Sequence, residues 1–266
     1  MQTLIKLHRL FPLTKVAHLM LRFLFKDKGA RPYTIKAFGK TFALYADWRD
    51  YQDATTIISP LYEKEVSRFL HKNLRRGEVF VNIGSNIGYF PLLVDSFERG
   101  NLIISVEPSV RNTLLQRKSI VKNDANIVLV DVAVGKRSGP TNLVFKPHNS
   151  GSGSTSGYLG LKPDNQLVLS EPVEMKTLPE ITSEADILLM DVQGGELEVL
   201  EGALKLIKTR KLPCIVMEFV ETEKGFKATE LLSENGYQRF EILENGELKK
   251  SFGVKHKRSY VYQLIS

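Results

Sequence analysis

The sequence is almost without cysteine, because only Cys214 occurs among its 266 residues. No disulfide can form within the chain, which favours a reducing compartment and predicts a cytoplasmic protein. Cys214 lies in the apolar run Cys214-Ile215-Val216-Met217, so we interpret it as a buried packing residue rather than a catalytic thiol. Histidine and cysteine residues with the spacing of a zinc site are missing as well.

Long apolar runs are also missing, because no stretch reaches the roughly 20 apolar residues of a membrane-spanning helix. In residues 1–25 basic side chains interrupt the apolar ones and no small-residue cleavage site follows, so no signal peptide is expected. The pattern predicts two short amphipathic helices that are broken near Pro12. These helices either cap the main domain or rest on anionic lipid as a peripheral membrane contact, and a disordered segment is the third alternative.

Positive charge is in excess, with a formal net charge of +7 and a pI near 9.3. Such a field favours anionic partners, namely nucleic acid, phosphorylated glycans or a membrane surface, and does not select one of them. Aromatic residues do not alternate with the basic ones as they do on a nucleic-acid platform, so a nucleic-acid partner is disfavoured.

Apolar strands alternate with helical patterns from residue 79 onward. The predicted strands are 79–83, 102–106, 127–131, 186–191, 213–219, 238–243 and 259–265, the predicted helices are 60–76, 88–98, 109–121, 195–208 and 224–235, and residues 31–45 form a predicted β-hairpin. The alternation is typical of an α/β fold with a mostly parallel sheet that is covered on both faces. A turn at Asn245-Gly246 predicts a locally antiparallel end of this sheet.

Residues 146–166 interrupt the alternation with small, polar residues. This composition is typical either of an exposed disordered loop or of a substrate-facing loop that orders on binding. The strands near 141–145 and 167–176 that flank it are predicted to pair with each other.

A glycine turn, Gly-Ser-Asn-Ile-Gly at residues 84–88, follows the first strand of the alternation, and Glu107 ends the next strand. The backbone comes close to a ligand where side chains are absent, and the acid accepts hydrogen bonds from ribose hydroxyls. The sequence therefore predicts a site for an adenosine-containing cofactor. The motifs Gly-x-Gly-x-x-Gly and Gly-Lys-Ser are missing, which disfavours a dinucleotide or ATP and favours S-adenosylmethionine.

Further motifs follow in order along the chain. The most specific is Asp-Val-Gln-Gly-Gly-Glu at residues 191–196, which Val-Leu-Glu-Gly-Ala follows at 199–203. The others are Val81-Asn82-Ile83-Gly84-Ser85-Asn86-Ile87-Gly88-Tyr89-Phe90, Val106-Glu107-Pro108-Ser109, Val130-Asp131-Val132-Ala133-Val134-Gly135, Met175-Lys176-Thr177-Leu178 and Ile215-Val216-Met217-Glu218. With these motifs the chain from about 79 to 221 resembles the FkbM family of methyltransferases, a branch of the class I S-adenosylmethionine-dependent fold.

The resemblance implies an α/β fold with a Rossmann-like class I methyltransferase sheet, mostly parallel with an antiparallel C-terminal strand, and S-adenosylmethionine as cofactor. It predicts a cofactor-binding methyltransferase domain at 61–266 and an N-terminal extension of helices and a hairpin at 1–60. Four positions depart from the family, with Asn82 in place of Asp, Met190 in place of Lys, Gln193 in place of Glu and Pro179 in place of Asp. Each departure removes a charge, so weaker cofactor binding is a hypothesis.

The resemblance places the cofactor at the ends of the first three strands. The predicted cofactor-binding residues are Asn82, Gly84, Ser85, Asn86, Gly88, Glu107, Pro108, Asp131 and Val132. Gly84 and Gly88 permit the turn, and Glu107 binds the ribose hydroxyls. Asp131 and Val132 end the third strand, where this fold usually holds the adenine.

Three carboxylates near the last parallel strands are the predicted catalytic residues: Asp191, Glu196 and Glu218. Asp191 and Glu218 end strands and Glu196 begins a helix, so we expect them to converge at one mouth of the sheet. In the favoured interpretation one of them is a general base for a substrate hydroxyl. In the other they bind a hard divalent cation that lowers the pKa of the hydroxyl.

The predicted function is O-methylation of a hydroxyl on a sugar, a glycan or a small metabolite. The family resemblance implies the hydroxyl chemistry, and no residue pattern identifies the acceptor. An RNA or protein methyltransferase is the alternative, which the net charge and the basic run 208–211 encourage. A catalytically degenerate binding protein is a further alternative, because the departures from the family remove charges near the predicted pocket.

Overall fold

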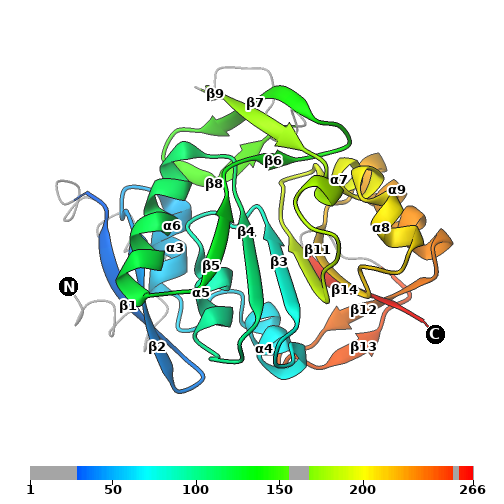
Figure 1. Cartoon of the computed structure of the whole chain (residues 1–266), viewed down its shortest axis with the longest axis horizontal. Coiled ribbons are helices and arrows are strands. Elements are labelled where there is room, and N and C mark those ends of the chain that lie inside the picture. The colour runs from blue at the N-terminus through cyan, green and yellow to red at the C-terminus, as the bar shows by residue number, and fades with distance from the viewer. Residues whose placement is uncertain (1–28, 156–167, 254–257, 266) are drawn as a thin grey trace.

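The computed structural model describes residues 29–155, 168–253 and 258–265, and an eight-stranded sheet forms its centre (Figure 1). The strands are β3 (Val79–Ile83), β4 (Leu102–Val106), β5 (Ile127–Val130), β10 (Ile187–Met190), β11 (Cys214–Phe219), β12 (Tyr237–Ile242), β13 (Leu248–Lys250) and β14 (Arg258–Leu264). They lie in the order β13-β12-β14-β11-β10-β3-β4-β5. The strands from β11 to β5 are parallel, and β14 runs antiparallel between β11 and β12, which confirms the predicted sheet.

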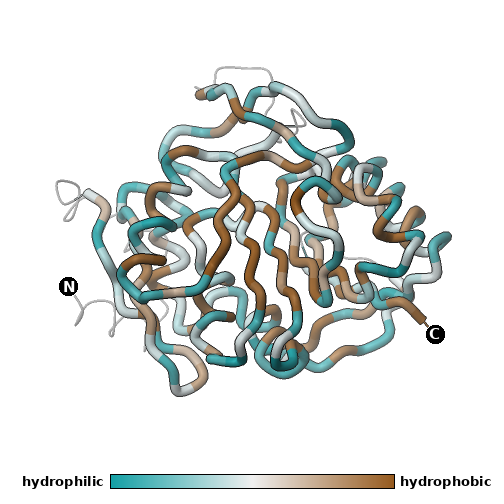
Figure 2. The backbone as a smooth tube through the Cα atoms, in the orientation of Figure 1, coloured by the Kyte–Doolittle hydropathy of each residue, from teal (hydrophilic) through white to brown (hydrophobic). Residues whose placement is uncertain are grey.

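Two hydrophobic cores enclose the parallel strands, one on each face, and Figure 2 shows hydrophobic residues concentrated along them. Phe80 packs into one core and Val81 into the other, since successive strand side chains point to opposite faces. The helices are α3 (Tyr51–Ile58), α4 (Lys64–Asn73), α5 (Tyr89–Asp95), α6 (Val110–Asn123), α7 (Glu196–Gly202), α8 (Leu204–Lys208) and α9 (Glu223–Glu234). The first four contribute to one core and the last three to the other, which confirms a Rossmann-like α/β fold.

The direction of the chain across the sheet reverses between β3 and β10. From β3 the chain proceeds outward through β4 to β5, and it later returns to β10 on the other side of β3. Connections therefore leave the carboxyl ends of β3 and β10 in opposite directions and open a crevice between them. Open α/β sheets bind their ligands at such a crevice.

The predicted N-terminal hairpin is confirmed, with strands β1 (Arg31–Ala37) and β2 (Lys40–Ala46). Phe38 and Gly39 have φ of 49° and 76°, as a two-residue hairpin turn requires. β2 packs on α6 through hydrogen bonds of its backbone, and both strands belong to the same core as α4 and α5. The domain boundary at residue 60 stays a prediction.

A second sheet has four strands in the order β6-β9-β7-β8, with bounds β6 (Ala133–Val134), β7 (Gly139–Lys146), β8 (Asn149–Ser154) and β9 (Leu169–Lys176). In Figure 1 it lies above the carboxyl ends of the central strands. β7 and β9 pair antiparallel, which confirms the predicted pairing of the strands near 141–145 and 167–176.

The loop predicted over residues 146–166 is wrong in its first part, where β8 forms. Its backbone pairs with β7, and Gly151 lets it approach α3, because a Cβ at Gly151 would lie 2.8 Å from Gln52 Cγ. Residues 156–167 of the predicted loop lie outside the described residues, as do the predicted amphipathic helices of residues 1–25.

Helix boundaries differ from the predicted ones at three places. The sequence pattern did not reveal α3, which Asp50 caps by accepting hydrogen bonds from two backbone N–H groups. The helix predicted at 60–76 begins at Lys64, because Glu63 has a left-handed φ of 40°. The helix predicted at 195–208 is divided at Ala203, whose φ of −92° and ψ of 2° leave the helical region. Among the described residues, none of the helices combines the length and the apolar character that a membrane crossing requires.

Candidate functional site

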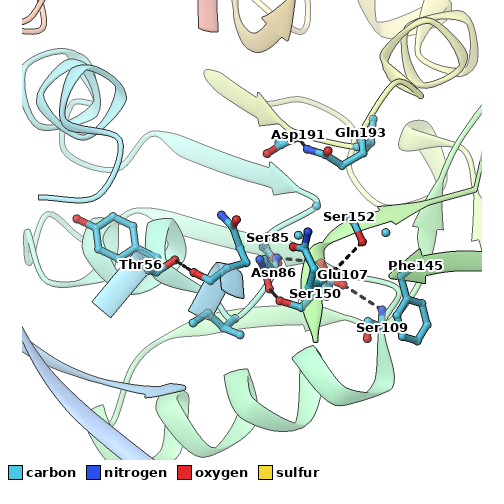
Figure 3. A pocket seen from close by; sticks show the side chains of 18 of the residues that line it. Thr56, Ser85, Asn86, Glu107, Ser109, Phe145, Ser150, Ser152, Asp191 and Gln193 are labelled. Atoms are coloured by element: carbon cyan, nitrogen blue, oxygen red, sulfur yellow. Dashed lines mark hydrogen bonds between the residues drawn. The ribbon is translucent and has the colours of Figure 1, made fainter. Parts of the chain in front are cut away.

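A cavity of about 1300 Å³ opens at the carboxyl ends of β3, β4, β10 and β11 (Figure 3). β7, β8 and the segment that precedes α4 complete its walls. One drug-sized ligand fills roughly 300–1000 Å³, so the cavity has room for a cofactor and a second molecule. Of the predicted site residues, those that line the cavity are Asn82, Gly84, Ser85, Asn86, Glu107, Pro108, Val132, Asp191 and Glu218, and those that do not are Gly88, Asp131 and Glu196.

The glycine turn is shaped by close backbone packing at Gly84. This residue has φ of 72°, and a Cβ on it would lie 2.0 Å from Asp191 O. The N–H groups of Gly84 and Ser85 donate to Val106 O at 2.9 and 3.1 Å, which ties the turn to the end of β4. Gly88 has φ of 87° at the start of α5, so it serves the turn and not the cavity wall.

Gly84→Ala is expected to destabilise the protein by about 3 kcal/mol, because the new methyl group meets the Asp191 backbone and strains a left-handed φ. Gly100→Ala is the matched control, since φ is 65° there but a Cβ would meet nothing within 4 Å. The control should lose only about 1 kcal/mol from backbone strain. Urea unfolding measures both losses, and equal losses would contradict the close contact at Gly84.

Glu107 joins the glycine turn to β4 and is 5% exposed. Its Oε2 accepts a hydrogen bond from Asn86 N at 2.9 Å, and its Oε1 accepts from Ser109 N at 3.0 Å and Asn112 Nδ2 at 3.2 Å (Figure 3). A carboxylate accepts about four hydrogen bonds, so Oε2 keeps the capacity to accept one from a hydroxyl in the cavity. Burial raises the pKa of Glu107 to about 7, against the lowering effect of its three hydrogen bonds.

Asn82 is buried in β3 and has one unsatisfied oxygen. Its Nδ2 donates to Leu189 O at 3.3 Å, whereas its Oδ1 has no hydrogen-bond partner among the residues that the structure describes. An unsatisfied buried acceptor costs roughly 1–3 kcal/mol, which a donor from a bound molecule would offset. The ammonium group of S-adenosylmethionine is such a donor, so Asn82 fits the predicted cofactor.

Of the two residues predicted to lie at the adenine, Asp131 and Val132, only Val132 lines the cavity, and Pro108 lines it as well. Asp131 does not line the cavity, because its exposed carboxylate pairs with Arg117 outside it. The reason is the tight turn after β5, in which Val132 N donates to Val130 O at 3.1 Å. This turn sends the side chains of Asp131 and Val132 to different sides, which a strand-end prediction does not resolve.

Asp191 follows β10 and lines the cavity with a carboxyl group of fixed orientation. Its N donates to Ile83 O at 3.0 Å, and its Oδ1 accepts from Gln193 Nε2 at 2.6 Å (Figure 3). Burial raises the pKa of Asp191, and the hydrogen bonds from Gln193 oppose that shift. A fixed orientation and a raised pKa are what a general base near neutral pH requires.

Glu196 lies near Asp191, whose charge helps to raise its pKa, but it does not line the cavity that Asp191 and Glu218 line. Its Oε1 accepts from Val192 N and Gly194 N, both at 3.3 Å, so Glu196 stabilises the loop before α7 and does not line the cavity. Burial raises its pKa to about 7. Two of the three predicted catalytic carboxylates, Asp191 and Glu218, therefore line the cavity. The described part of the chain contains no group of three acids, histidines or cysteines that could hold a metal ion.

Tyr62 and Glu63 line the cavity from the segment before α4, and the sequence did not single them out. The Tyr62 hydroxyl accepts from Gln52 Nε2 at 2.6 Å, and its interaction with the Glu63 carboxyl group opposes the rise in the pKa of that group. Burial, followed by the nearby Asp191 carboxyl group, raises the pKa of Glu63 to about 7, although solvent in the cavity reaches the side chain. No spacing rule relates this segment to Asp191, so the sequence carried no signal for it.

β8 is anchored beside the glycine turn by Ser150. Its N donates to Asp50 Oδ2 at 2.7 Å, and its Oγ lies 3.2 Å from Asn86 Oδ1 (Figure 3). Because Asp50 also caps α3, one carboxylate joins α3 to β8. The buried Asp53 beside it pairs with Arg111 at 2.6 Å. Ser150 therefore links α3, β8 and Asn86 of the glycine turn.

The chain matches a known protein family. Residues 82–239, more than half of the chain, match the family described as Methyltransferase FkbM domain. Among solved structures, precorrin-6y C5,15-methyltransferase from Geobacter metallireducens is 14% identical, over 76% of this chain and 87% of that chain, with a TM-score of 0.44. Fibrillarin from Aeropyrum pernix with natively bound S-adenosyl-L-methionine is 12% identical, over 89% of this chain and 83% of that chain, with a TM-score of 0.42.

These structural likenesses are too distant to add to the domain match. A search of curated proteins finds no match. The family assignment therefore rests on residues 82–239, which include the glycine turn, Glu107 and Asp191.

Proposed function

Because the chain belongs to the FkbM methyltransferase family, we propose that it transfers a methyl group from S-adenosylmethionine to a hydroxyl of a sugar, a glycan or a small metabolite. The family supplies the methyl-transfer chemistry, and the hydroxyl acceptor is the proposed part. The observation that carries it is the Asp191 carboxyl group, which Gln193 holds at the switch point of the sheet, in a cavity with room for two molecules.

The cofactor half of the cavity offers groups that fit S-adenosylmethionine, which supplies an electrophilic methyl group when bound. Asn82 Oδ1 would accept a hydrogen bond from the ammonium group, and Glu107 Oε2 would accept one from a ribose hydroxyl. Pro108 and Val132 would contact the adenine. The backbone at Gly84 keeps the turn close to these groups.

Asp191 would act as the general base of the reaction. Its Oδ1 is engaged by Gln193 Nε2, which leaves Oδ2 to accept a hydrogen bond from the acceptor hydroxyl. Moving the hydroxyl proton to this oxygen makes the acceptor oxygen a better nucleophile as it attacks the methyl carbon. Holding the hydroxyl beside the base also removes the entropy cost of bringing the reactants together.

The acceptor half of the cavity is polar, which supports a hydroxyl-rich acceptor. Its walls carry Tyr62, Glu63, Asp191, Glu218 and Arg258. Carboxylates accept hydrogen bonds from hydroxyl groups, and a sugar offers several hydroxyls in a small volume. An apolar acceptor would leave these polar groups desolvated without partners, which costs free energy.

Incubation with methyl-labelled S-adenosylmethionine tests the proposal. The acceptor panel contains monosaccharides, oligosaccharides, small hydroxylated metabolites, total RNA and denatured protein. Label in a methyl ether of a sugar or metabolite is the expected result. Label in RNA or protein would instead establish the alternative that the net charge of +7 suggests. Calorimetry measures cofactor binding in parallel, and undetectable binding would identify a degenerate protein.

Removal of metal ions is expected to leave methyl transfer within about two-fold of the untreated rate. Asp191 supplies the base in the proposed step, and Glu196, which a three-carboxylate cation site would need, is engaged by backbone N–H groups. The measurement is the labelled-transfer rate after dialysis against EDTA. A loss of rate that magnesium or manganese restores would contradict the base and favour the cation interpretation.

A further inference from the structure

The Tyr62–Glu63 pair lies outside the matched family domain but faces the same cavity. It immediately precedes α4, and residues 82–239 carry the family match. The cavity is therefore completed by a segment that the family motifs do not include. The acid in this segment lies close enough to Asp191 for the two carboxyl groups to interact electrostatically.

Glu63 holds an unusual backbone conformation. Its φ of 40° and ψ of 64° are left-handed, a region that costs a residue with a side chain about 1–2 kcal/mol. Glycine or asparagine would relieve this strain, yet the position carries a long acidic side chain. Strain of this kind persists where the surrounding structure imposes it, and it concentrates at functional sites. The conformation starts α4 and leaves the Glu63 side chain in the cavity wall.

Tyr62, which precedes Glu63, is held in place by neighbouring side chains. Its ring packs edge-on against Tyr89, with centroids 5.2 Å apart, and lies 6.0 Å from Phe90. Gln52 Nε2 donates to its hydroxyl at 2.6 Å, which holds the hydroxyl in place near Glu63. The segment that carries Glu63 is therefore anchored to α3 and α5.

Two carboxyl groups that repel each other do not both ionise readily. The titratable groups that act on Glu63 are Tyr62, Glu65 and Asp191, of which Asp191 has the larger effect among the two acids. Burial and this repulsion raise the pKa of Glu63 to about 7. The pair therefore loses its second proton less readily than either acid alone would, and while it holds one proton, one member accepts a hydrogen bond and the other donates one.

We propose that Glu63 is a second catalytic carboxylate, which acts with Asp191 on the acceptor hydroxyl. This role rests on the proposed O-methyltransferase function. The ionised member takes the hydroxyl proton as the O–H bond breaks and the new C–O bond forms at the methyl carbon. The electron pair of the broken C–S bond stays on sulfur, which becomes a neutral thioether. The protonated member donates a hydrogen bond to a second oxygen of the acceptor.

A titration without acceptor tests the pairing. The protein is labelled with glutamate carrying ¹³C at the carboxyl carbon, and the Glu63 signal is identified by its loss in Glu63→Gln. We expect Glu63 to titrate near pH 7 and its pKa to fall by about one unit or more in Asp191→Asn. A pKa near the ordinary value, or one that Asp191→Asn does not change, would overturn the pairing whatever the enzyme methylates.

Kinetics with the best acceptor of the panel tests the catalytic role. Glu63→Gln is expected to lower kcat about 100-fold, to change the pH profile of kcat, and to leave the S-adenosylmethionine Kd within about three-fold. Glu244→Gln is the control. It removes an exposed carboxylate that pairs with Lys64, which is the residue after Glu63 and the first residue of α4. A similar melting temperature and an unchanged Kd show that Glu63→Gln is folded.

The outcomes separate the two proposals. Wild-type transfer to a hydroxyl with full activity in Glu63→Gln would overturn the role of Glu63 and leave the proposed function intact. If wild-type protein binds the cofactor but methylates no hydroxyl in the panel, the proposed function fails, and the catalytic role of Glu63 fails with it.

Discussion

Asp191→Asn is expected to lower kcat by about 10²- to 10⁴-fold and to change cofactor affinity by less than about three-fold. Asparagine keeps the oxygen that accepts from Gln193 Nε2 at 2.6 Å, and the backbone bond to Ile83 O does not involve the side chain. The loop after β10 therefore keeps its conformation, while the group can no longer take a proton. The measurement is kcat with the best acceptor of the panel, together with the calorimetric Kd of S-adenosylmethionine.

Asp186→Asn is the matched control on the same strand. Asp186 stands at the opposite end of β10, where its Oδ2 accepts from Val79 N at 2.7 Å, and it does not line the cavity. The same loss of charge there should leave kcat within about two-fold. Comparable losses in both variants would point to a general effect on the sheet, and full activity in Asp191→Asn would refute the base.

The central sheet was predictable because its strands are apolar on both faces. Residues 79–83 and 187–190 form buried strands that are bounded by polar or glycine residues, so each strand stands out without long-range information. The glycine turn and Glu107 were predictable because they are close in sequence. A strand, a turn and an acid at the next strand tip lie close in sequence, and the fold brings them together through a single helix.

Contacts between distant segments were not predictable. Ser150 meets Asp50 although 100 positions separate them, and Glu63 acts on Asp191 from a segment that precedes the first parallel strand. Hydrophobic periodicity fixes which face of an element is buried, but it does not specify which polar groups meet across a cavity. The small, polar composition of β8 therefore suggested a loop, whereas its backbone pairs with β7.

The sequence also did not predict the direction in which single side chains point. Asp131 stands at a strand end and Glu196 at a helix start, as the sequence indicated, yet neither lines the cavity. A tight turn directs the Asp131 carboxylate to Arg117, and the Glu196 carboxylate accepts hydrogen bonds from two backbone N–H groups. In both cases a competing local partner determines where the carboxylate goes. Asp191 and Glu107 do line the cavity, and each retains an oxygen with spare acceptor capacity.

Glu107→Gln is expected to weaken S-adenosylmethionine binding by about 100-fold, which corresponds to roughly 2.7 kcal/mol. Oε2 accepts from Asn86 N and Oε1 from Ser109 N, so either orientation of the glutamine amide places one donor against another. The glycine turn loses its tie to β4, and the ribose hydroxyl loses a charged acceptor. Calorimetry measures the change, and a melting curve shows whether the variant is folded.

The pH dependence of wild-type binding separates a role of Glu107 in the site from a role in folding alone. Burial raises the pKa of Glu107 to about 7, and only the ionised group accepts on both oxygens, so affinity should fall as the pH drops below about 7 and level off above it. Glu107→Gln should reduce this dependence. Glu78→Gln, at the opposite edge of the sheet where Glu78 Oε2 accepts from Arg75 N at 2.7 Å, should bind and titrate as the wild type does. If Glu107→Gln also kept the wild-type affinity and pH profile, the ribose would have to bind away from the end of β4, and the cofactor would occupy a different part of the cavity.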